Sequence, residues 1–379
     1  MNEDKATRYQ RLKRRASIVS LVWSVALLTV LVVTGRSVSL RTLAERAAGA
    51  SAGTSWVPAV SVAFEVALLA AVNELGSLPI AFYSGFLVER RYGLSTQHVG
   101  DWAVDQAKAF TVATLLATGA ASLLYFIIRL DPDRWWLPAG AVLALLSVGV
   151  ARLSPVLLLP LFYRVKPLDG EALRQRLVSL AERSGAPVLG AYEWGLSTKT
   201  RHANAALTGL GSTRRILVSD TMLSAYSDEE IEVVLAHELA HHVHRDIWKG
   251  LAFESALVLA GFYVAAQTLD WSIGPAQLRG PSDPAGLPVL LLALGAVSLA
   301  MAPVAHALSR AYERRADRFA LELTRNPRAF ISAMRRLADQ NLAEEHPSRF
   351  VLWLFSSHPP IRDRIAAAES FAAPRGVRG

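Results

Sequence analysis

The chain of 379 residues contains no cysteine. This absence excludes disulfide bonds, metal sites built on thiolates and catalysis by a thiol nucleophile. A metal ion in this protein must therefore be held by nitrogen and oxygen ligands, and the nine histidines are its main source of nitrogen.

Charged residues are also scarce, at 19% of the chain, whereas hydrophobic residues make up 52% and the mean hydropathy is positive. This balance is typical of a membrane protein rather than of a soluble globule. The net charge is +8, but Lys and Arg cluster beside the apolar segments, where they set the orientation of a membrane protein. We therefore predict the lipid bilayer as a partner and exclude nucleic acid.

Apolar runs long enough to span a bilayer recur along the chain. The first run follows the basic segment 8–15, and no small-x-small cleavage site comes soon after it, so we interpret it as a retained signal anchor. Six such runs predict six transmembrane helices, at about 17–34, 57–88, 109–128, 137–162, 248–269 and 287–308.

The second run contains Glu65, Asn73 and Glu74, which are unusual in a segment that crosses lipid. Such polar side chains avoid the hydrocarbon in one of two ways. They pair with neighbouring helices, or they line a water-filled space inside the protein. The sequence leaves both alternatives open.

His237, Glu238 and His241 form the motif H-E-x-x-H. Two histidines four residues apart lie on one face of a helix and can bind one zinc ion together. Glu238 cannot easily ligate the same ion, but it can take a proton from a water molecule in the open coordination position. The motif therefore predicts one Zn²⁺ ion and the hydrolysis of a peptide bond.

The surroundings of the motif are those of a small α+β domain. Ser227 and Glu230 form a capping box, which predicts that the motif helix begins at Asp228. Short strands are predicted at 188–194, 203–207 and 215–219. An exposed edge strand beside a zinc helix can hold a peptide substrate by main-chain hydrogen bonds, and we assign 203–207 to that edge.

A catalytic zinc site needs a third protein ligand. His244 lies one turn beyond the motif, and we interpret it as a surface or interface residue. Glu313 is better placed, because the sixth run continues as a helix that carries it to the membrane depth of His237. Asp317, one turn further, can accept the other ring N–H of a ligating histidine. An acid pair among arginines also fits a solvated salt-bridge face, so the residues alone leave both interpretations open.

The distribution of Lys and Arg predicts an inside location for the N-terminus, the polar central segment and the C-terminal tail. The motif helix runs almost directly into the fifth span, which places the metal close to the membrane. We therefore predict a mainly α-helical protein in four regions: a membrane region 1–163 with four spans, a cytoplasmic zinc domain 164–247, two further spans in 248–308, and 309–379 as the C-terminal part of the zinc domain.

Several short motifs occur in an order that is specific to one known family. They are Leu78-Pro79, Tyr92-Gly93-Leu94, Pro160-Leu161-Phe162, Lys166-Pro167-Leu168, His202-Ala203-Asn204-Ala205, Asp220-Thr221, the H-E-x-x-H motif, Glu313 with Asp317, and Ser357-His358-Pro359-Pro360 with Arg364. Over about 78–364 the sequence thus resembles the type I CAAX prenyl endopeptidases, integral-membrane zinc proteases related to the heat-shock-type membrane zinc proteases.

The resemblance implies a role for each matching residue. His237, His241 and Glu313 would be the zinc ligands, Glu238 the general base, and Asp317 the carboxylate that supports a ligand. Asn204, with its neighbours Ala203 and Ala205, would bind substrate, and His358 and Arg364 would bind substrate or stabilise the oxyanion. The implied fold is a ring of membrane helices around a large chamber, capped by the zinc domain.

Two features differ from the eukaryotic members of that family. The sequence predicts six spans rather than seven, and Ala206 stands where the family has an aromatic residue. The leading expectation is a membrane zinc endopeptidase that recognises a prenylated C-terminal CAAX sequence.

Two other functions are compatible with the sequence. A composition rich in Ala and Arg without cysteine favours a bacterial cell membrane, where a broad quality-control protease is the alternative. A different class is a non-catalytic membrane scaffold or transporter in which zinc is a structural staple.

Overall fold

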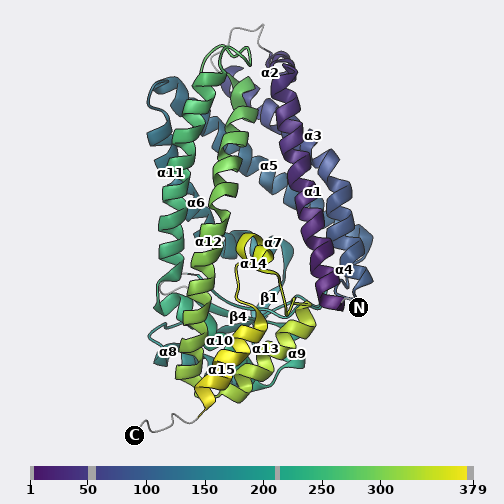
Figure 1. Ribbon diagram of the computed structural model, residues 1–379, viewed down its shortest axis with the longest axis vertical. Coiled ribbons are helices and arrows are strands. Elements are labelled where there is room, and N and C mark those ends of the chain that lie inside the picture. The colour runs from purple at the N-terminus through teal and green to yellow at the C-terminus, as the bar shows by residue number, and fades with distance from the viewer. Residues whose placement is uncertain (1–3, 50–56, 210–213, 374–379) are drawn as a thin grey trace.

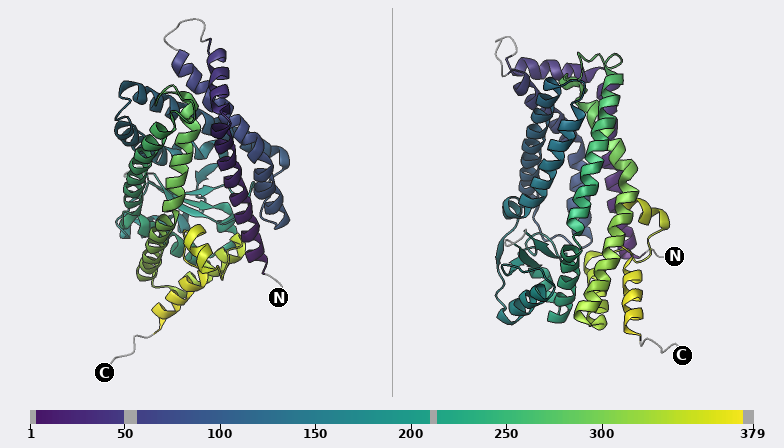
Figure 2. Two further views of the ribbon diagram at one scale, coloured as in Figure 1. Left: turned by 45° about the horizontal axis from the view of Figure 1, so that its top comes forward. Right: turned by 90° about the vertical axis from the view of Figure 1, so that its left-hand side faces the viewer.

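The structure is a computed structural model, and it describes residues 4–49, 57–209 and 214–373. Long helices stand side by side along the longest axis of the molecule (Figure 1). The sheet and most of the short helices gather at one end of this bundle, beside the start of the first helix (Figures 1 and 2).

Five helices are long and apolar enough to cross a membrane within the described residues. They lie in Lys5–Val33, Ala59–Arg91, Val99–Leu130, Asp246–Ser272 and Pro284–Thr324. A continuous helix satisfies every backbone polar group internally, which is why apolar runs of this length form helices in lipid. From Ile18 onward the exposed side chains of the first helix are mostly apolar, as a lipid-facing surface requires; Val22 is 60% exposed.

The helices of the membrane region cover the predicted runs, and the first, third and sixth extend about ten residues or more beyond them. They are α1 (Lys5–Val33), α3 (Val57–Phe82) continued by a π-helical turn η2 (Tyr83–Leu87) and α4 (Val88–Arg91), α5 (Val99–Leu130), α6 (Trp136–Leu157) with α7 (Leu159–Phe162), α11 (Asp246–Ser272) and α12 (Leu287–Thr324) after the 3₁₀ turn η4 (Pro284–Gly286). The fourth run forms α6 and α7, whose apolar part, Trp136–Ala151, is shorter than the other spans. Six spans therefore remain a prediction.

Polar residues in the second run pair with neighbouring helices. Asn73 accepts a hydrogen bond from the hydroxyl of Ser24 on α1 at 3.0 Å. Glu74 accepts one from the amide of Gln106 on α5 at 3.2 Å. The first of the two alternatives is thus confirmed for these residues, whereas one carboxylate oxygen of Glu65 is buried without a hydrogen bond to the described residues.

The sequence did not predict α2 (Arg36–Ala47), which crosses the end of the bundle remote from the sheet (Figure 1). Arg41 on this helix forms a buried ion pair with Asp283, with 2.5 Å between Nη1 and Oδ2. The pair fastens α2 to the turn η4, which leads into α12. In the sequence, α2 resembles a loop, because it is a polar segment between two apolar runs. The residue that pairs with Arg41 lies far away in the chain, so no local pattern reveals that the segment is packed.

The sheet has four strands, β1 (Val165–Pro167), β2 (Ala191–Trp194), β3 (Ala205–Thr208) and β4 (Arg215–Ser219), in the order β1-β2-β4-β3. β2 and β4 are parallel, and the other two pairs are antiparallel. The predicted strands are confirmed within three residues, and β1 was not predicted. β3 lies at the edge of the sheet, as expected.

The short helices complete the domain around the sheet. They are α8 (Glu171–Arg183), α9 (Asp220–Ala225), α10 (Asp228–Val243), α13 (Pro327–Asn341), α14 (Arg349–Phe355) and α15 (Ile361–Ala372). α10 begins at Asp228 with the predicted capping box, in which Ser227 and Glu230 exchange hydrogen bonds. Its apolar residues Leu235 and Leu239 are fully buried in one core with residues of the sheet and of α13. This core fixes the position of α10 against the sheet and α13.

Candidate functional site

α10 and α12 carry the three residues that converge on one point. α12 has 38 residues and is therefore about 57 Å long, whereas the hydrocarbon of a bilayer is about 30 Å thick. Its last turns thus leave the membrane and pass beside α10. One nitrogen of His237, one of His241 and a carboxylate oxygen of Glu313 lie within 4.8 Å of one another.

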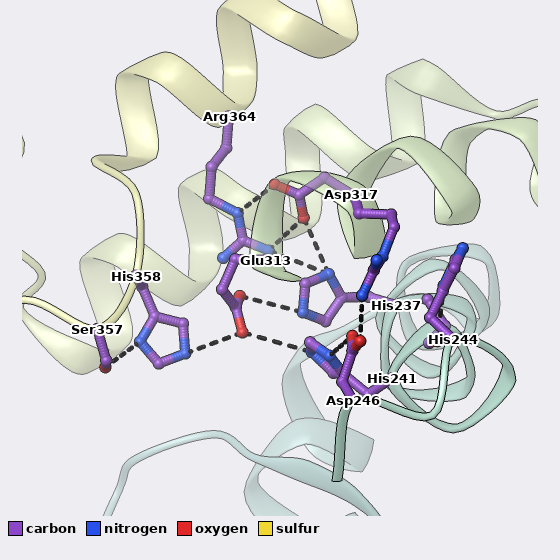
Figure 3. A network of polar contacts seen from close by, with 11 residues as sticks. His237, His241, His244, Asp246, Glu313, Asp317, Ser357, His358 and Arg364 are labelled. Carbon is purple, nitrogen blue, oxygen red and sulfur yellow. Dashed lines mark hydrogen bonds and ion pairs between the residues drawn. The ribbon is translucent and has the colours of Figure 1, made fainter. Parts of the chain in front are cut away.

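The spacing of these atoms suits a metal ion. Nε2 of His237 is 3.3 Å from Oε2 of Glu313, and Nε2 of His241 is 3.4 Å from Oε1 (Figure 3). Two ligand atoms at zinc bonding distance in a tetrahedral site are roughly 3.3–3.6 Å apart. In addition, Oε2 of Glu313 is buried and has no hydrogen-bond partner among the described residues, which leaves it available to a cation.

Each histidine is oriented by a carboxylate behind it. Nδ1 of His237 lies 2.9 Å from Oδ1 of Asp317, and Nδ1 of His241 lies 3.2 Å from Oδ2 of Asp246. These contacts fix the proton on Nδ1 and leave Nε2 of both rings available to a metal ion. The sequence predicted the position of Asp317 but not that of Asp246.

Asp246 was missed because of its place in the chain. It is the first residue of α11 and resembles an ordinary acidic residue at a helix start. Arg245 before it has a left-handed conformation, with φ of 56°, and separates α10 from α11. This break turns the chain so that Asp246 faces back towards His241, and the side chain also pairs with Arg315.

Arg364 lies behind Asp317 rather than in open space. It is buried, with 9% of its surface exposed, and donates hydrogen bonds to both carboxylate oxygens of Asp317 at 2.8 and 2.5 Å (Figure 3). A guanidinium committed to a carboxylate in this way orients it and compensates its charge. The predicted contact of Arg364 with substrate stays a prediction, and its position favours a positioning role.

His358 approaches the site from the loop between α14 and α15. Its Nε2 is 3.5 Å from Oε1 of Glu313, its Nδ1 is 2.9 Å from the hydroxyl of Ser357, and 63% of its side chain is exposed. The loop is fixed by Arg310, which donates hydrogen bonds to the carbonyls of Leu352 and Ser356, both at 2.7 Å. The imidazole therefore stands at the accessible side of the three converging residues.

Glu238 lies between the two histidines of α10, and among the described residues no hydrogen bond or ion pair occupies its carboxylate. Burial raises the pKa of this carboxyl above its ordinary value, although the neighbouring His237 and His241 act in the opposite direction. A free carboxylate with a raised pKa is suited to accept a proton from water. His244 is not part of the group: its Nδ1 contacts the carbonyl of Ala240 at 2.8 Å, and its ring packs against Phe319.

The predicted substrate residues lie at the start of the edge strand β3 and just before it. Asn204 exchanges hydrogen bonds with Ser219: its carbonyl accepts from the backbone N–H at 2.9 Å, and its own N–H donates to the hydroxyl at 3.0 Å. Its side chain is exposed, while Ala203 and Ala205 on either side are buried. A cleft of about 420 Å³ extends from His358 and Arg364 towards the start of α1.

Known proteins resemble this chain in both sequence and fold. Residues 167–372 match peptidase family M48, and residues 2–164 match a family described as CAAX prenyl protease N-terminal, five membrane helices. The metalloprotease YhfN of Bacillus subtilis is 33% identical over 308 residues, which cover 80% of this chain and 72% of that protein.

Two further relatives extend this likeness beyond bacteria. A CAAX prenyl protease 1 homolog of Arabidopsis thaliana is 26% identical over 314 residues, which cover 78% of this chain and 70% of that protein. The crystal structure of S. mikatae Ste24p superposes with a TM-score of 0.85 at 24% identity, over 96% of this chain and 88% of that one. The two chains thus share one fold.

Proposed function

The chain belongs to peptidase family M48 and is a metalloendopeptidase of the membrane, and on that premise we propose that its metal is one Zn²⁺ ion held by His237, His241 and Glu313. The convergence of these three side chains supports this proposal most directly, because two oriented imidazoles and a buried carboxylate oxygen that accepts no hydrogen bond from the described residues lie at ligand spacing. Segments 164–247 and 309–379 together would form the zinc domain, since each contributes ligands.

The residues around the metal have distinct chemical tasks in this proposal. Bound zinc would polarise a water molecule and the substrate carbonyl. Glu238 accepts the proton of the attacking water at a carboxylate oxygen and returns it to the leaving nitrogen. His358 donates a ring N–H to the carbonyl oxygen as negative charge develops there. β3 binds the substrate main chain beside Asn204 and Ala205.

A single substitution tests this mechanism. Glu238→Gln keeps the size of the side chain but removes the base, so we expect full metal content and peptide cleavage reduced at least about 10²-fold. Glu229→Gln on the same helix is the matched control, because that side chain is half-exposed and pairs with Arg176 at the surface. Unchanged cleavage by Glu238→Gln would overturn the mechanism and favour a non-catalytic scaffold with a structural metal.

We propose a prenylated protein with a C-terminal CAAX sequence as the substrate, on the strength of the name borne by the Arabidopsis relative and the motifs of the edge strand. Quality control of membrane proteins is the second candidate, because Ala206 replaces an aromatic residue on that strand and the Bacillus relative is named only a metalloprotease. Cleavage of a farnesylated CAAX peptide should be compared with that of an unmodified helical membrane peptide. Equal rates would refute the CAAX specificity.

The zinc domain faces the cytoplasm in this proposal, and the membrane is that of a bacterial cell. The bias of Lys and Arg towards one side of the spans supports the orientation. Reporter fusions after Asp131 and Pro281 should report the outside, and a fusion after Gly170 the inside. An outside signal at Gly170 would refute a cytoplasmic zinc site.

A further inference from the structure

The edge of β3 offers its main-chain groups at alternate residues. Asn204 and Ser219 form a hydrogen-bonded pair across the β3–β4 ladder. Such pairs alternate along an antiparallel ladder, so Ala206 and Thr208 also direct their N–H and C=O groups towards β4. Ala203, Ala205 and Leu207 consequently direct theirs to the open side, where a substrate strand would pair.

Asn341, the last residue of α13, already forms hydrogen bonds with the open side of Ala203, the first of these residues. Its Oδ1 accepts a hydrogen bond from the N–H of Ala203 at 3.1 Å, and its Nδ2 donates one to the carbonyl of Ala203 at 3.3 Å. The carboxamide thus pairs with Ala203 as the peptide group of an incoming strand would. Among the described residues, no hydrogen bond reaches the open side of Ala205 or Leu207.

The carboxamide of Asn341 is held firmly in this position. Nδ1 of His202 lies 3.1 Å from the same Oδ1, and the opposite ring nitrogen of His202 lies 3.5 Å from Glu89 on α4. The next residue, Leu342, is buried in a small cluster with Tyr9 of α1, and its carbonyl accepts a hydrogen bond from Gln10. Elements of the membrane region therefore fix the end of the substrate edge.

The direction of a bound substrate determines which part meets Asn341. An added strand that pairs antiparallel with β3 places its C-terminal side beside the N-terminal end of β3, where Ala203 lies. Substrate residues that extend past Ala205 on that side cannot continue the ladder, because both main-chain groups of Ala203 already form hydrogen bonds with Asn341. They must leave the sheet for the cleft of about 420 Å³, which is lined by Asn341, His358 and Arg14.

We propose that Asn341 is a specificity-determining residue that closes the β3 edge and so restricts the length of the substrate segment that follows the scissile bond. A short C-terminal segment fits the cleft, whereas a long one must bend away from the sheet without main-chain pairing. Asn341 acts by forming hydrogen bonds with the main-chain groups of Ala203, and it touches no reacting atom. The inference rests on the proposed peptidase function and deepens its C-terminal specificity by naming a residue that limits how far the scissile bond lies from a free C-terminus.

The test compares peptides that share one sequence up to the scissile bond and carry about 3, 6 or 12 residues after it, which are about 10, 20 or 40 Å when extended. Full-length, zinc-loaded protein in lipid vesicles is assayed for kcat/KM with each peptide, and mass spectrometry identifies the bond cleaved. The wild-type protein should prefer the shortest segment.

Asn341→Ala frees both main-chain groups of Ala203 for the substrate. We expect the ratio of kcat/KM for the longest over the shortest peptide to rise about 30-fold, the effect of two hydrogen bonds of ordinary strength. Gln340→Ala is the matched control, because Gln340 donates to the carbonyl of Arg201, outside the substrate edge. Asn341→Asp keeps the acceptor and the side-chain size, so it should raise the ratio less, and it serves if the alanine variant does not fold.

Three results of this test would contradict the role of Asn341 or the function on which it rests. A ratio that stays at the wild-type value in both Asn341 variants overturns the inference, even if their activity falls, because a purely structural residue lowers cleavage of all lengths alike. A wild-type protein without length preference overturns it as well. Failure of the wild-type protein to cleave any peptide would instead refute the proposed function on which the inference rests.

Discussion

Asp317→Ala separates metal binding from folding at the candidate site. Asp317 contacts Nδ1 of His237 and receives two hydrogen bonds from Arg364, so its removal affects a proposed metal ligand and a buried cation at once. Without this acceptor His237 is no longer held in one tautomer. Metal affinity should fall about 10–100-fold, which corresponds to about 1.4–2.8 kcal/mol.

The same substitution leaves the guanidinium of Arg364 buried without a carboxylate. Removal of one partner of a buried ion pair costs about 3–5 kcal/mol of stability. The double variant Asp317→Ala, Arg364→Met removes both charges and keeps an apolar side chain of similar length. We therefore expect it to recover most of the lost stability but none of the lost metal affinity, because His237 still lacks its partner.

Two measurements on protein in detergent micelles check this reasoning. Competition with a chelator gives the metal affinity, and the midpoint of thermal unfolding of the metal-free protein gives the stability. Asp246→Ala serves for comparison with Asp317→Ala, because the cations that pair with Asp246 lie near the surface and can rehydrate; they are Arg315 and Lys249. This variant should weaken metal binding with a smaller loss of stability. Metal affinity restored in the double variant would refute the role given to Asp317.

Three further predictions follow from the contacts. Glu313→Ala should lower the metal content measured by elemental analysis, whereas His244→Ala should leave it unchanged; the reverse result would overturn the ligand assignment. Burial opposes protonation of His237, yet the neighbouring carboxylates raise its pKa to about 9 in the metal-free protein. Because a metal ion binds the unprotonated imidazole, metal affinity measured by chelator titration should rise between pH 6.5 and about 9 and then level off. Arg41→Ala should lower stability by about 3–5 kcal/mol, because it leaves a buried carboxylate unpaired, whereas Arg279→Ala, which breaks an exposed pair, should cost about 0–1 kcal/mol in the same thermal assay.

The sequence by itself determined the features that depend on local patterns. The spacing of His237 and His241 places both on one helical face, and the capping box at Ser227 sets the start of their helix, since both follow from helix geometry over a few residues. The long apolar runs predicted helices because lipid permits hardly any other structure for them. β3 was correctly assigned to the sheet edge, and Glu313 was placed beside the motif because α12 continues past the membrane.

Only the tertiary structure decided which side chains meet across long separations in the chain. Arg364 contacts Asp317 rather than open solvent because α15 packs against α12, and Asp246 reaches His241 because a left-handed residue turns the chain. Asn341 pairs with Ala203 across 138 residues, which no periodicity or spacing records. Polar side chains of these types occur throughout the sequence, and their partners depend on how whole elements pack around a shared core, so only the fold shows that Asn341 closes the β3 edge.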